Sequence, residues 1–193
     1  MINDPVLINE WHVVARSEEV TTDAPFAARL LDEDIVLWRV GDQLMAWQDL
    51  CIHRGTKLSL GRIENDALIC PYHGWVYNEE GKCIRIPAHP DQIPPTRARV
   101  KPYRAVERYG WVWVSLGEPT HDIPAFPEWD DPTFRKIHCG PYRFKANAPR
   151  VVENFLDVAH FPFVHEGYLG DPDHTEISDY EAVIDENGVT SDN

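Results

Sequence analysis

Short apolar runs bounded by turn signals dominate the chain between residues 11 and 118. The clearest runs are DIVLWRV (34–40), QLMAWQDL (43–50), ALICPY (67–72) and WVYN (75–78). Glycine, asparagine and aspartate, which favour tight turns, lie in the intervening segments VGDQ, IENDA and NEEGK. Two further β-rich runs, RARVKPYRAVERYG and WVWVSL, meet at Tyr109-Gly110. This pattern predicts a small antiparallel β domain.

The pattern changes after residue 118. GEPTHDIPAFPEWDDP (117–132) carries four prolines and predicts an extended linker or surface loop, and FRKIHCGPYRFKA (134–146) predicts one more strand. Pro149 suits the first turn of a helix over RVVENFLDVAHF (150–161), which Pro162 ends or bends. The final run, from residue 175 to 193, predicts a strand, a turn and the start of another strand. We therefore expect two domains, residues 1–118 and 119–193, in a mostly β and α+β protein.

Composition and charge narrow the possible functions. The chain has 193 residues and is 43% hydrophobic, which is typical of a globular protein with a real core. Its net charge of -14 would repel a phosphate backbone, so we expect no nucleic-acid partner. The N-terminal MINDPVLINEW lacks a basic region followed by an apolar run, and runs such as WVWVSL are too short to span a bilayer. We expect no signal peptide, no membrane segment and a cytoplasmic location.

Two short loops, CIHRG (51–55) and CPYHGW (70–75), each carry one cysteine and one histidine. The four candidate ligands are Cys51, His53, Cys70 and His73. The simplest interpretation is that no metal binds, with two buried cysteines and two exposed histidines in unrelated loops. Tetrahedral zinc is another, but zinc fingers usually group cysteines in one pair and histidines in the other. The mixed order is typical of a Rieske [2Fe–2S] cluster, in which two cysteines hold one iron and two histidines hold the other.

Residues near these loops refine the interpretation. Gly55 and Gly74 closely follow the histidines, where we expect the backbone to turn tightly. Tyr77 either donates a hydrogen bond to a cysteine sulfur or packs as a core aromatic. The basic residues near the loops form either a docking patch for an acidic redox partner or ordinary solvated charges. They are Arg54, Lys57 and Arg62.

Residues 11 to about 118 resemble the Rieske domain of bacterial aromatic-ring oxygenases. Respiratory Rieske proteins carry two further cysteines that form a disulfide, and this chain has Thr56 and Tyr72 in those places. It also has Trp75 where the respiratory type has a serine that hydrogen-bonds a sulfide. Because fewer hydrogen bonds stabilise the reduced cluster less, we expect a potential at the low end of the Rieske range.

A second constellation follows in NFLDVAHFPFVH. Residues three apart on a helix lie near one face, so we expect Asn154, Asp157 and His160 to project together. His165 lies beyond Pro162, and the chain must turn before His165 can approach His160. An amphipathic helix with a polar wet face would give the same pattern. Two histidines and a carboxylate, however, form the facial triad of non-haem Fe(II) oxygenases.

Together the constellations resemble the alpha subunit of a Rieske non-haem iron oxygenase over nearly the whole chain. The resemblance implies that His160 and His165 bind a mononuclear Fe(II), and that Asp157 bridges to a Rieske histidine of a neighbouring subunit in a homotrimer. Asn154 would sit near the iron. Residues 119–193 would begin an α+β, helix-grip-like catalytic domain. The family's third iron ligand is a carboxylate far downstream, so we expect it beyond residue 193 and expect this chain to be an incomplete N-terminal portion.

The resemblance also implies a function. We expect a terminal oxygenase that receives electrons from NAD(P)H through a reductase or ferredoxin and uses O₂ to hydroxylate or demethylate a small aromatic or heterocyclic substrate. The HFPFVHE context is most similar to the monooxygenase and demethylase branch, and ring dihydroxylation stays open. One alternative is a Rieske ferredoxin-type electron carrier, which would need little beyond residue 118. Another is a zinc-stapled structural protein, which would be colourless because Zn²⁺ is d¹⁰.

Overall fold

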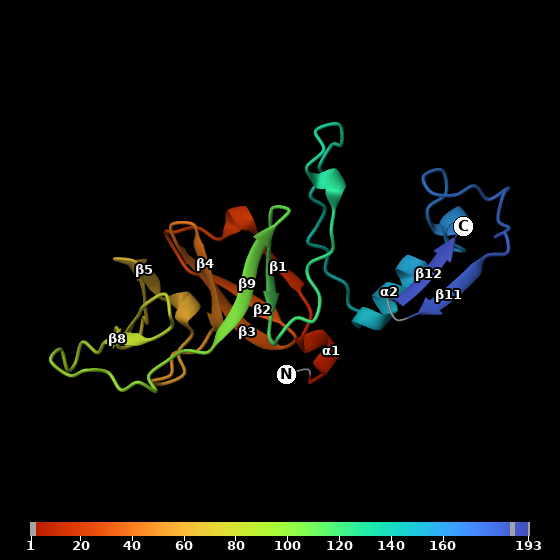
Figure 1. Ribbon diagram of the computed structural model, residues 1–193. Coiled ribbons are helices and arrows are strands. Elements are labelled where there is room, and N and C mark those ends of the chain that lie inside the picture. Colours follow the sequence, from red (N-terminus) through yellow and green to blue (C-terminus); the bar gives the residue numbers. More distant parts are fainter. Residues whose placement is uncertain (1–2, 186–187, 193) are drawn as a thin grey trace. The chain divides into compact units, whose positions relative to one another are not determined.

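The computed structural model in Figure 1 describes residues 3–185 and 188–192. The chain folds as two compact units that divide between Arg135 and Lys136. Antiparallel sheets make up most of the first unit, which confirms the predicted β domain. In the part of the chain that the structure describes, no helix has both the length and the apolar character needed to cross a bilayer.

The first unit consists of short strands joined by turns. Its strands are β1 (His12–Arg16), β2 (Phe26–Leu30), β3 (Glu33–Val40), β4 (Gln43–Gln48), β5 (Arg62–Glu64), β6 (Ala67–Ile69), β7 (Val76–Tyr77), β8 (Cys83–Arg85), β9 (Pro102–Arg108) and β10 (Trp111–Ser115). Its short helices are α1 (Pro5–Ile8) and the 3-10 turns η1 (Ser17–Glu19), η2 (Leu58–Leu60) and η3 (Pro127–Trp129). The turn predicted from IENDA joins β5 to β6, with Asn65 and Asp66 in the left-handed region at φ 50° and 58°.

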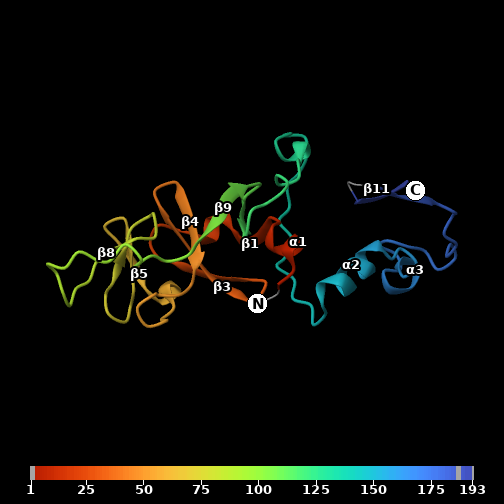
Figure 2. The same ribbon diagram turned by 60° about the horizontal axis from the view of Figure 1, so that its bottom comes forward.

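Two antiparallel sheets build this unit. One has six strands in the order β1-β10-β9-β4-β3-β2, and the other has four in the order β5-β6-β7-β8. Figures 1 and 2 show the smaller sheet at one end of the larger one. The two cysteine–histidine loops flank the β5–β6 hairpin in the chain, because one lies between β4 and β5 and the other connects β6 to β7.

Strand β3 is buried on both faces and organises two cores. Ile35 and Leu37 belong to a core with β1 and β10, whereas Val36 and Trp38 belong to a second core with the smaller sheet. All four side chains are fully buried. Because side chains alternate along a strand, burial on both faces needs an uninterrupted apolar run, which DIVLWRV supplies.

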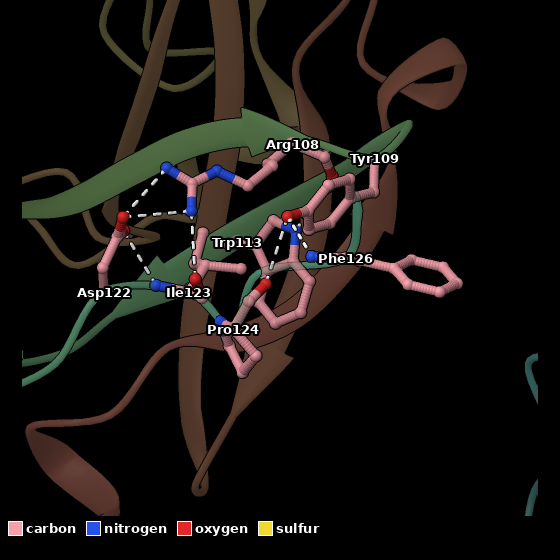
Figure 3. Close-up of polar contacts among 7 residues, drawn as sticks. All are labelled: Arg108, Tyr109, Trp113, Asp122, Ile123, Pro124 and Phe126. Carbon is pink, nitrogen blue, oxygen red and sulfur yellow. Dashed lines mark hydrogen bonds and ion pairs between the residues drawn. The ribbon is translucent and has the colours of Figure 1, made fainter. Parts of the chain in front are cut away.

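The β9–β10 hairpin holds the proline-rich segment that the sequence predicts as a linker (Figure 3). The Arg108 guanidinium donates to the Asp122 carboxylate at 3.1 and 3.2 Å and to the Ile123 carbonyl at 3.0 Å. The Arg108 carbonyl in turn accepts a hydrogen bond of 3.0 Å from the Trp113 indole. Residues 119–135 therefore stay with the first unit, and the structure divides the chain later than the sequence composition suggests.

Tyr109 completes this attachment from the tip of the hairpin. Its hydroxyl donates to the Pro124 carbonyl at 3.1 Å and accepts from the Phe126 amide at 2.9 Å. Tyr109 has φ 59°, a left-handed conformation that non-glycine residues adopt rarely. From the hairpin tip, the Tyr109 hydroxyl reaches both partners in the proline-rich segment (Figure 3).

The second unit has two helices and a hairpin. They are α2 (Ala148–Leu156), α3 (Phe161–Val164), β11 (Glu181–Asp185) and β12 (Gly188–Asp192). Pro149 lies in the first turn of α2 as predicted, and the Asn147 side chain caps the helix by accepting from the Arg150 amide at 3.0 Å. Strands β11 and β12 confirm the predicted final strands, and residues 186 and 187, where the turn is predicted, lie outside the described residues.

The strand predicted over residues 134–146 is wrong. Residues 135–144 adopt no regular secondary structure. Gly140 has φ 85°, outside the β region, and Pro141 has no amide hydrogen to donate to a ladder. The alternation of side chains suited a strand, but the backbone at these two residues interrupts one.

The single helix predicted over residues 150–161 is also wrong in its second half. Helix α2 ends at Leu156, and Asp157 is extended at φ -82° and ψ 106°. The Asp157 carboxylate accepts from the Ala159 amide at 2.9 Å, a local hydrogen bond that competes with helix continuation. A separate one-turn helix, α3, then begins at Phe161 with Pro162 in its first turn.

We predict that Tyr109→Phe loosens the proline-rich segment while leaving the hairpin folded. Phenylalanine keeps the ring contact with Trp129 but loses both hydroxyl hydrogen bonds. A bond of about 0.5–1.5 kcal/mol corresponds to roughly twofold to thirteenfold faster hydrogen exchange at the Phe126 amide. Tyr168→Phe is the control, because Tyr168 is 92% exposed. An unchanged Phe126 exchange rate in Tyr109→Phe would contradict the expectation.

Candidate metal centres

The first cysteine–histidine loop closes on itself through its backbone. The Cys51 amide donates to the Thr56 carbonyl at 2.8 Å, and the Gly55 amide donates to the Cys51 carbonyl at 2.8 Å. Gly55 has φ 75°, which confirms the tight turn predicted there. At the base of the loop, the buried Asp49 carboxylate accepts from the Ser59 amide at 2.7 Å and from the Ser59 hydroxyl at 2.6 Å. The loop is thus held at both ends.

The second loop repeats this backbone pattern. The Cys70 amide donates to the Trp75 carbonyl at 2.9 Å, and the Gly74 amide donates to the Cys70 carbonyl at 3.1 Å. Gly74 has φ 68°, and a Cβ there would lie 3.1 Å from the Pro87 ring. Glycine is therefore favoured by both the backbone conformation and the close approach of the following loop.

Both cysteine side chains lie in the core that joins the two sheets. Cys51 and Cys70 are each 2% exposed. Burial raises the pKa of the Cys70 thiol, so binding a metal there must displace a proton. The Tyr77 hydroxyl lies 3.2 Å from the Cys51 sulfur, which confirms the predicted contact while Tyr77 is also fully buried in the core. Burial, followed by the Cys51 contact, raises the pKa of Tyr77, so its hydroxyl keeps a proton to donate.

The two histidines of the loops lie close together and are more exposed than the cysteines. The His53 and His73 ring centroids are 4.6 Å apart. His53 Nδ1 is buried without a hydrogen-bond partner. Burial above all, with smaller contributions from His73 and Arg54, lowers the pKa of His53 and favours the neutral imidazole that binds metals. These loops therefore present two buried thiols and an imidazole nitrogen with a free lone pair, a donor set that fits a Rieske cluster.

An aromatic ring stacks on one of these imidazoles. Trp75 lies parallel to His53, with an interplanar angle of 6° and centroids 4.5 Å apart. In the sequence, Trp75 is visible only as a difference from respiratory proteins. No local pattern signals its contact with His53, because the two residues belong to different loops that the fold brings together.

The basic residues near the loops are only partly available to a partner. Lys57 pairs with Asp34 at 2.9 Å, and Arg62 pairs with Glu64 at 3.1 Å. Arg54 is exposed beside His53. The pairing favours ordinary surface charges as the interpretation of Lys57 and Arg62.

The second constellation assembles around α3. His160 precedes the helix and His165 follows it, and their ring centroids are 5.2 Å apart. His160 Nδ1 is buried without hydrogen-bond geometry to any partner, although Asp157 Oδ2 lies 3.3 Å away. The Phe161 ring stands against both imidazoles, at 4.9 and 5.9 Å between centroids. The break after Leu156, rather than one continuous helix, brings Asp157 to His160.

Asp157 lines two hollows of the second unit. One, of about 550 Å³, also contains Asn154 and Arg150. The other, of about 590 Å³, lies between the end of α2 and the β11–β12 hairpin and is lined mainly by apolar side chains such as Tyr180 and Val189. Within residues 3–185 and 188–192, no three His, Cys, Asp or Glu side chains are grouped to hold one metal ion. A Rieske cluster needs no such group, because each iron has two protein ligands.

Two different protein families match the two parts of the chain that carry the candidate metal sites. The Rieske [2Fe-2S] domain family matches residues 10–106, and the vanillate O-demethylase oxygenase C-terminal domain family matches residues 144–192. Methylxanthine N1-demethylase NdmA of Pseudomonas putida is 39% identical over 185 residues, which is 91% of this chain and 53% of that protein. The iron-sulfur subunit TsaM1 of the toluene-4-sulfonate monooxygenase system of Comamonas testosteroni is 35% identical, over 84% of this chain and 47% of that protein.

Solved structures give the same result. The structure of Pseudomonas putida NdmA matches with a TM-score of 0.82 and 37% identity, over 92% of this chain and 56% of that one. Dicamba monooxygenase bound to dicamba matches with a TM-score of 0.78 and 28% identity, over 96% of this chain and 56% of that one. This chain spans about half the length of the relatives it matches.

The two sheets with their paired cysteine–histidine loops define a Rieske iron–sulfur protein. The match of residues 144–192 to an oxygenase C-terminal domain narrows the class of Rieske protein further. The chain belongs to the family of Rieske non-haem iron oxygenase alpha subunits, as the resemblance in its motifs indicated.

We predict that Tyr77→Phe lowers the reduction potential of the cluster. Reduction adds negative charge to the sulfurs, so losing the donor to Cys51 destabilises the reduced state. A hydrogen bond of about 0.5–1.5 kcal/mol corresponds to a fall of roughly 20–65 mV for one electron. Tyr72→Phe is the control, because its ring lies 63% exposed beside His73. Equal potentials in Tyr77→Phe and wild type, measured by redox titration, would contradict this role.

Proposed function

We propose that this chain carries the Rieske cluster site and two ligands of the mononuclear iron site of a terminal oxygenase. One observation carries the proposal. Each predicted metal site brings two imidazoles together, with ring centroids 4.6 Å apart for His53 and His73 and 5.2 Å apart for His160 and His165. In the first pair, the buried Nδ1 atom of His53 has no hydrogen-bond partner. A buried polar atom without a partner costs free energy, and a metal ion removes that cost.

The first site would hold its cluster through the two loops. Cys51 and Cys70 would bind one iron, and His53 and His73 would bind the other. The buried cysteines and closed loops keep these four side chains in place, and Trp75 keeps the His53 ring in one plane. When bound, the cluster supplies single electrons, which a reductase or ferredoxin obtains from NAD(P)H.

The second site would hold Fe(II) through His160 and His165. Asp157 lies within reach of the His160 ring, where a carboxylate orients an imidazole and raises its basicity. Asn154 lies on the same side of α2 as the polar hollow that Asp157 lines. When bound, this iron supplies the O₂ chemistry of hydroxylation or demethylation. We assign only two of its ligands to this chain, and in a homotrimer Asp157 would face a Rieske histidine of a neighbouring subunit.

The substrate class follows from the apolar hollow and from the relatives. The hollow between α2 and the hairpin has an aromatic and aliphatic lining with Asp157 at its edge, which suits a small aromatic or heterocyclic molecule. The relatives include a methylxanthine demethylase and dicamba monooxygenase. A cytoplasmic monooxygenase or demethylase is therefore the function that we favour. Residues 1–118 would form the Rieske part with residues 119–135 attached to it, and the second unit would be the start of the catalytic part.

The test is iron and acid-labile sulfide analysis of the chain, purified and reconstituted without oxygen. We expect two irons and two sulfides per chain, together with additional Fe(II) that exchanges by dialysis. Cys70→Ala should lose the sulfide and its two irons. The double variant His160→Ala/His165→Ala should keep the cluster and lose only the exchangeable Fe(II).

Each alternative outcome has a distinct meaning. Bound zinc without sulfide would refute the Rieske site. A full cluster without exchangeable Fe(II), or Fe(II) binding that survives the double variant, would refute the mononuclear site and favour an electron carrier. His174→Ala is the matched control, because His174 is exposed and contacts Asp171 at 3.3 Å in the same unit.

A further inference from the structure

We propose that Gly170 is a positioning residue for the His160–His165 pair. The inference rests on the proposed iron site and extends it to a residue that does not bind the metal. The observation behind it is the close contact between Gly170 and the backbone that joins the two histidines.

Helix α3 sets the distance between the imidazoles. The Val164 amide donates to the His160 carbonyl at 2.8 Å, and the His165 amide donates to the Phe161 carbonyl at 3.0 Å. The two histidines thus stand at opposite ends of a single turn, with ring centroids 5.2 Å apart. If this turn opens, the two side chains separate.

A single helical turn is not stable without support, because nucleation fixes several residues for one hydrogen bond. The following loop supplies that support. The Tyr168 and Leu169 amides both donate to the His165 carbonyl at 3.0 Å. The Gly167 amide donates to the Gly170 carbonyl at 3.0 Å, which folds residues 166–170 into a compact turn.

This turn brings Gly170 directly against the start of α3. A Cβ on Gly170 would lie 2.5 Å from the Pro162 nitrogen and 2.7 Å from both the Pro162 Cα and the Phe161 carbonyl carbon. All three are backbone atoms, so no side-chain rotation can relieve the clash. Pro162 is itself buried. Any side chain at position 170 must therefore displace the backbone two residues after His160.

Gly167 in the same loop provides a matched control. It has φ 74°, so alanine there is strained, but its Cβ would have no atom within 4 Å. Gly170 is not among the glycines with positive φ, so alanine there meets the clash without backbone strain. Both substitutions add one methyl group. Gly170→Ala tests the close contact, whereas Gly167→Ala tests backbone strain alone.

The test uses the cluster-loaded chain with ¹⁵N-labelled histidine and Zn²⁺ as a redox-inert probe of the pair. In the wild type, the ring nitrogens of His160 and His165 should shift together in the NMR spectrum with one dissociation constant. Gly170→Ala should weaken Zn²⁺ binding by about 10–100-fold, the usual effect of losing support around a metal ligand, and the two rings should no longer respond together. Gly167→Ala should keep the joint response even where it lowers stability.

The outcomes separate this inference from the proposed function. A wild-type chain in which His160 and His165 do not respond jointly to Zn²⁺ would refute the iron site itself. A joint response of equal affinity in wild type and Gly170→Ala would refute the positioning role alone. Loss of the joint response in both glycine variants would also refute it, because loop strain rather than the Gly170 contact would then be the cause. In a second, uniformly ¹⁵N-labelled sample, unchanged α2 amide signals in Gly170→Ala would show that the unit stays folded.

Discussion

The burial of two cysteine side chains in the core between the two sheets is the constraint on which the first unit depends. Cys51 and Cys70 are packed among the side chains of β3, β4 and the smaller sheet, so the loops that carry them cannot move without disturbing that core. The loops then close through matching backbone hydrogen bonds and bring His53 and His73 side by side. A rigid scaffold of this kind keeps ligands in place before any metal binds.

The candidate iron site of the second unit is built differently. Its residues come from a helix end, an Asp-stabilised break and a one-turn helix, rather than from a packed sheet. Large apolar side chains around it are exposed, among them Phe155 at 76% and Leu156 at 77%. The geometry of the His160–His165 pair therefore depends on local hydrogen bonds and on the close contact at Gly170.

Much of the first unit was predictable from the sequence, and so was the pairing of imidazoles in each candidate site. Strand β3 is predictable because its apolar run is long enough to contribute to two cores, and the cysteine–histidine spacing identifies the two loops. The wrong predictions, the long helix and the strand over residues 134–146, occur where the local conformation of one residue interrupts the expected element. Asp157 uses its own side chain to end α2, and Gly140 leaves the β region inside an otherwise strand-like segment. Contacts such as Trp75 on His53 or Gly170 on Pro162 join residues through the fold, and no single-sequence pattern encodes them.

The most direct test of the central claim is pulsed EPR of the reduced cluster in chain labelled with ¹⁵N only at histidine. The structure leads us to expect hyperfine couplings from two histidine nitrogens, with one coupling lost in His53→Cys and the other in His73→Cys. Couplings that stay unchanged by the isotope, or a reduced chain with no EPR signal, would contradict a cluster held by Cys51, His53, Cys70 and His73.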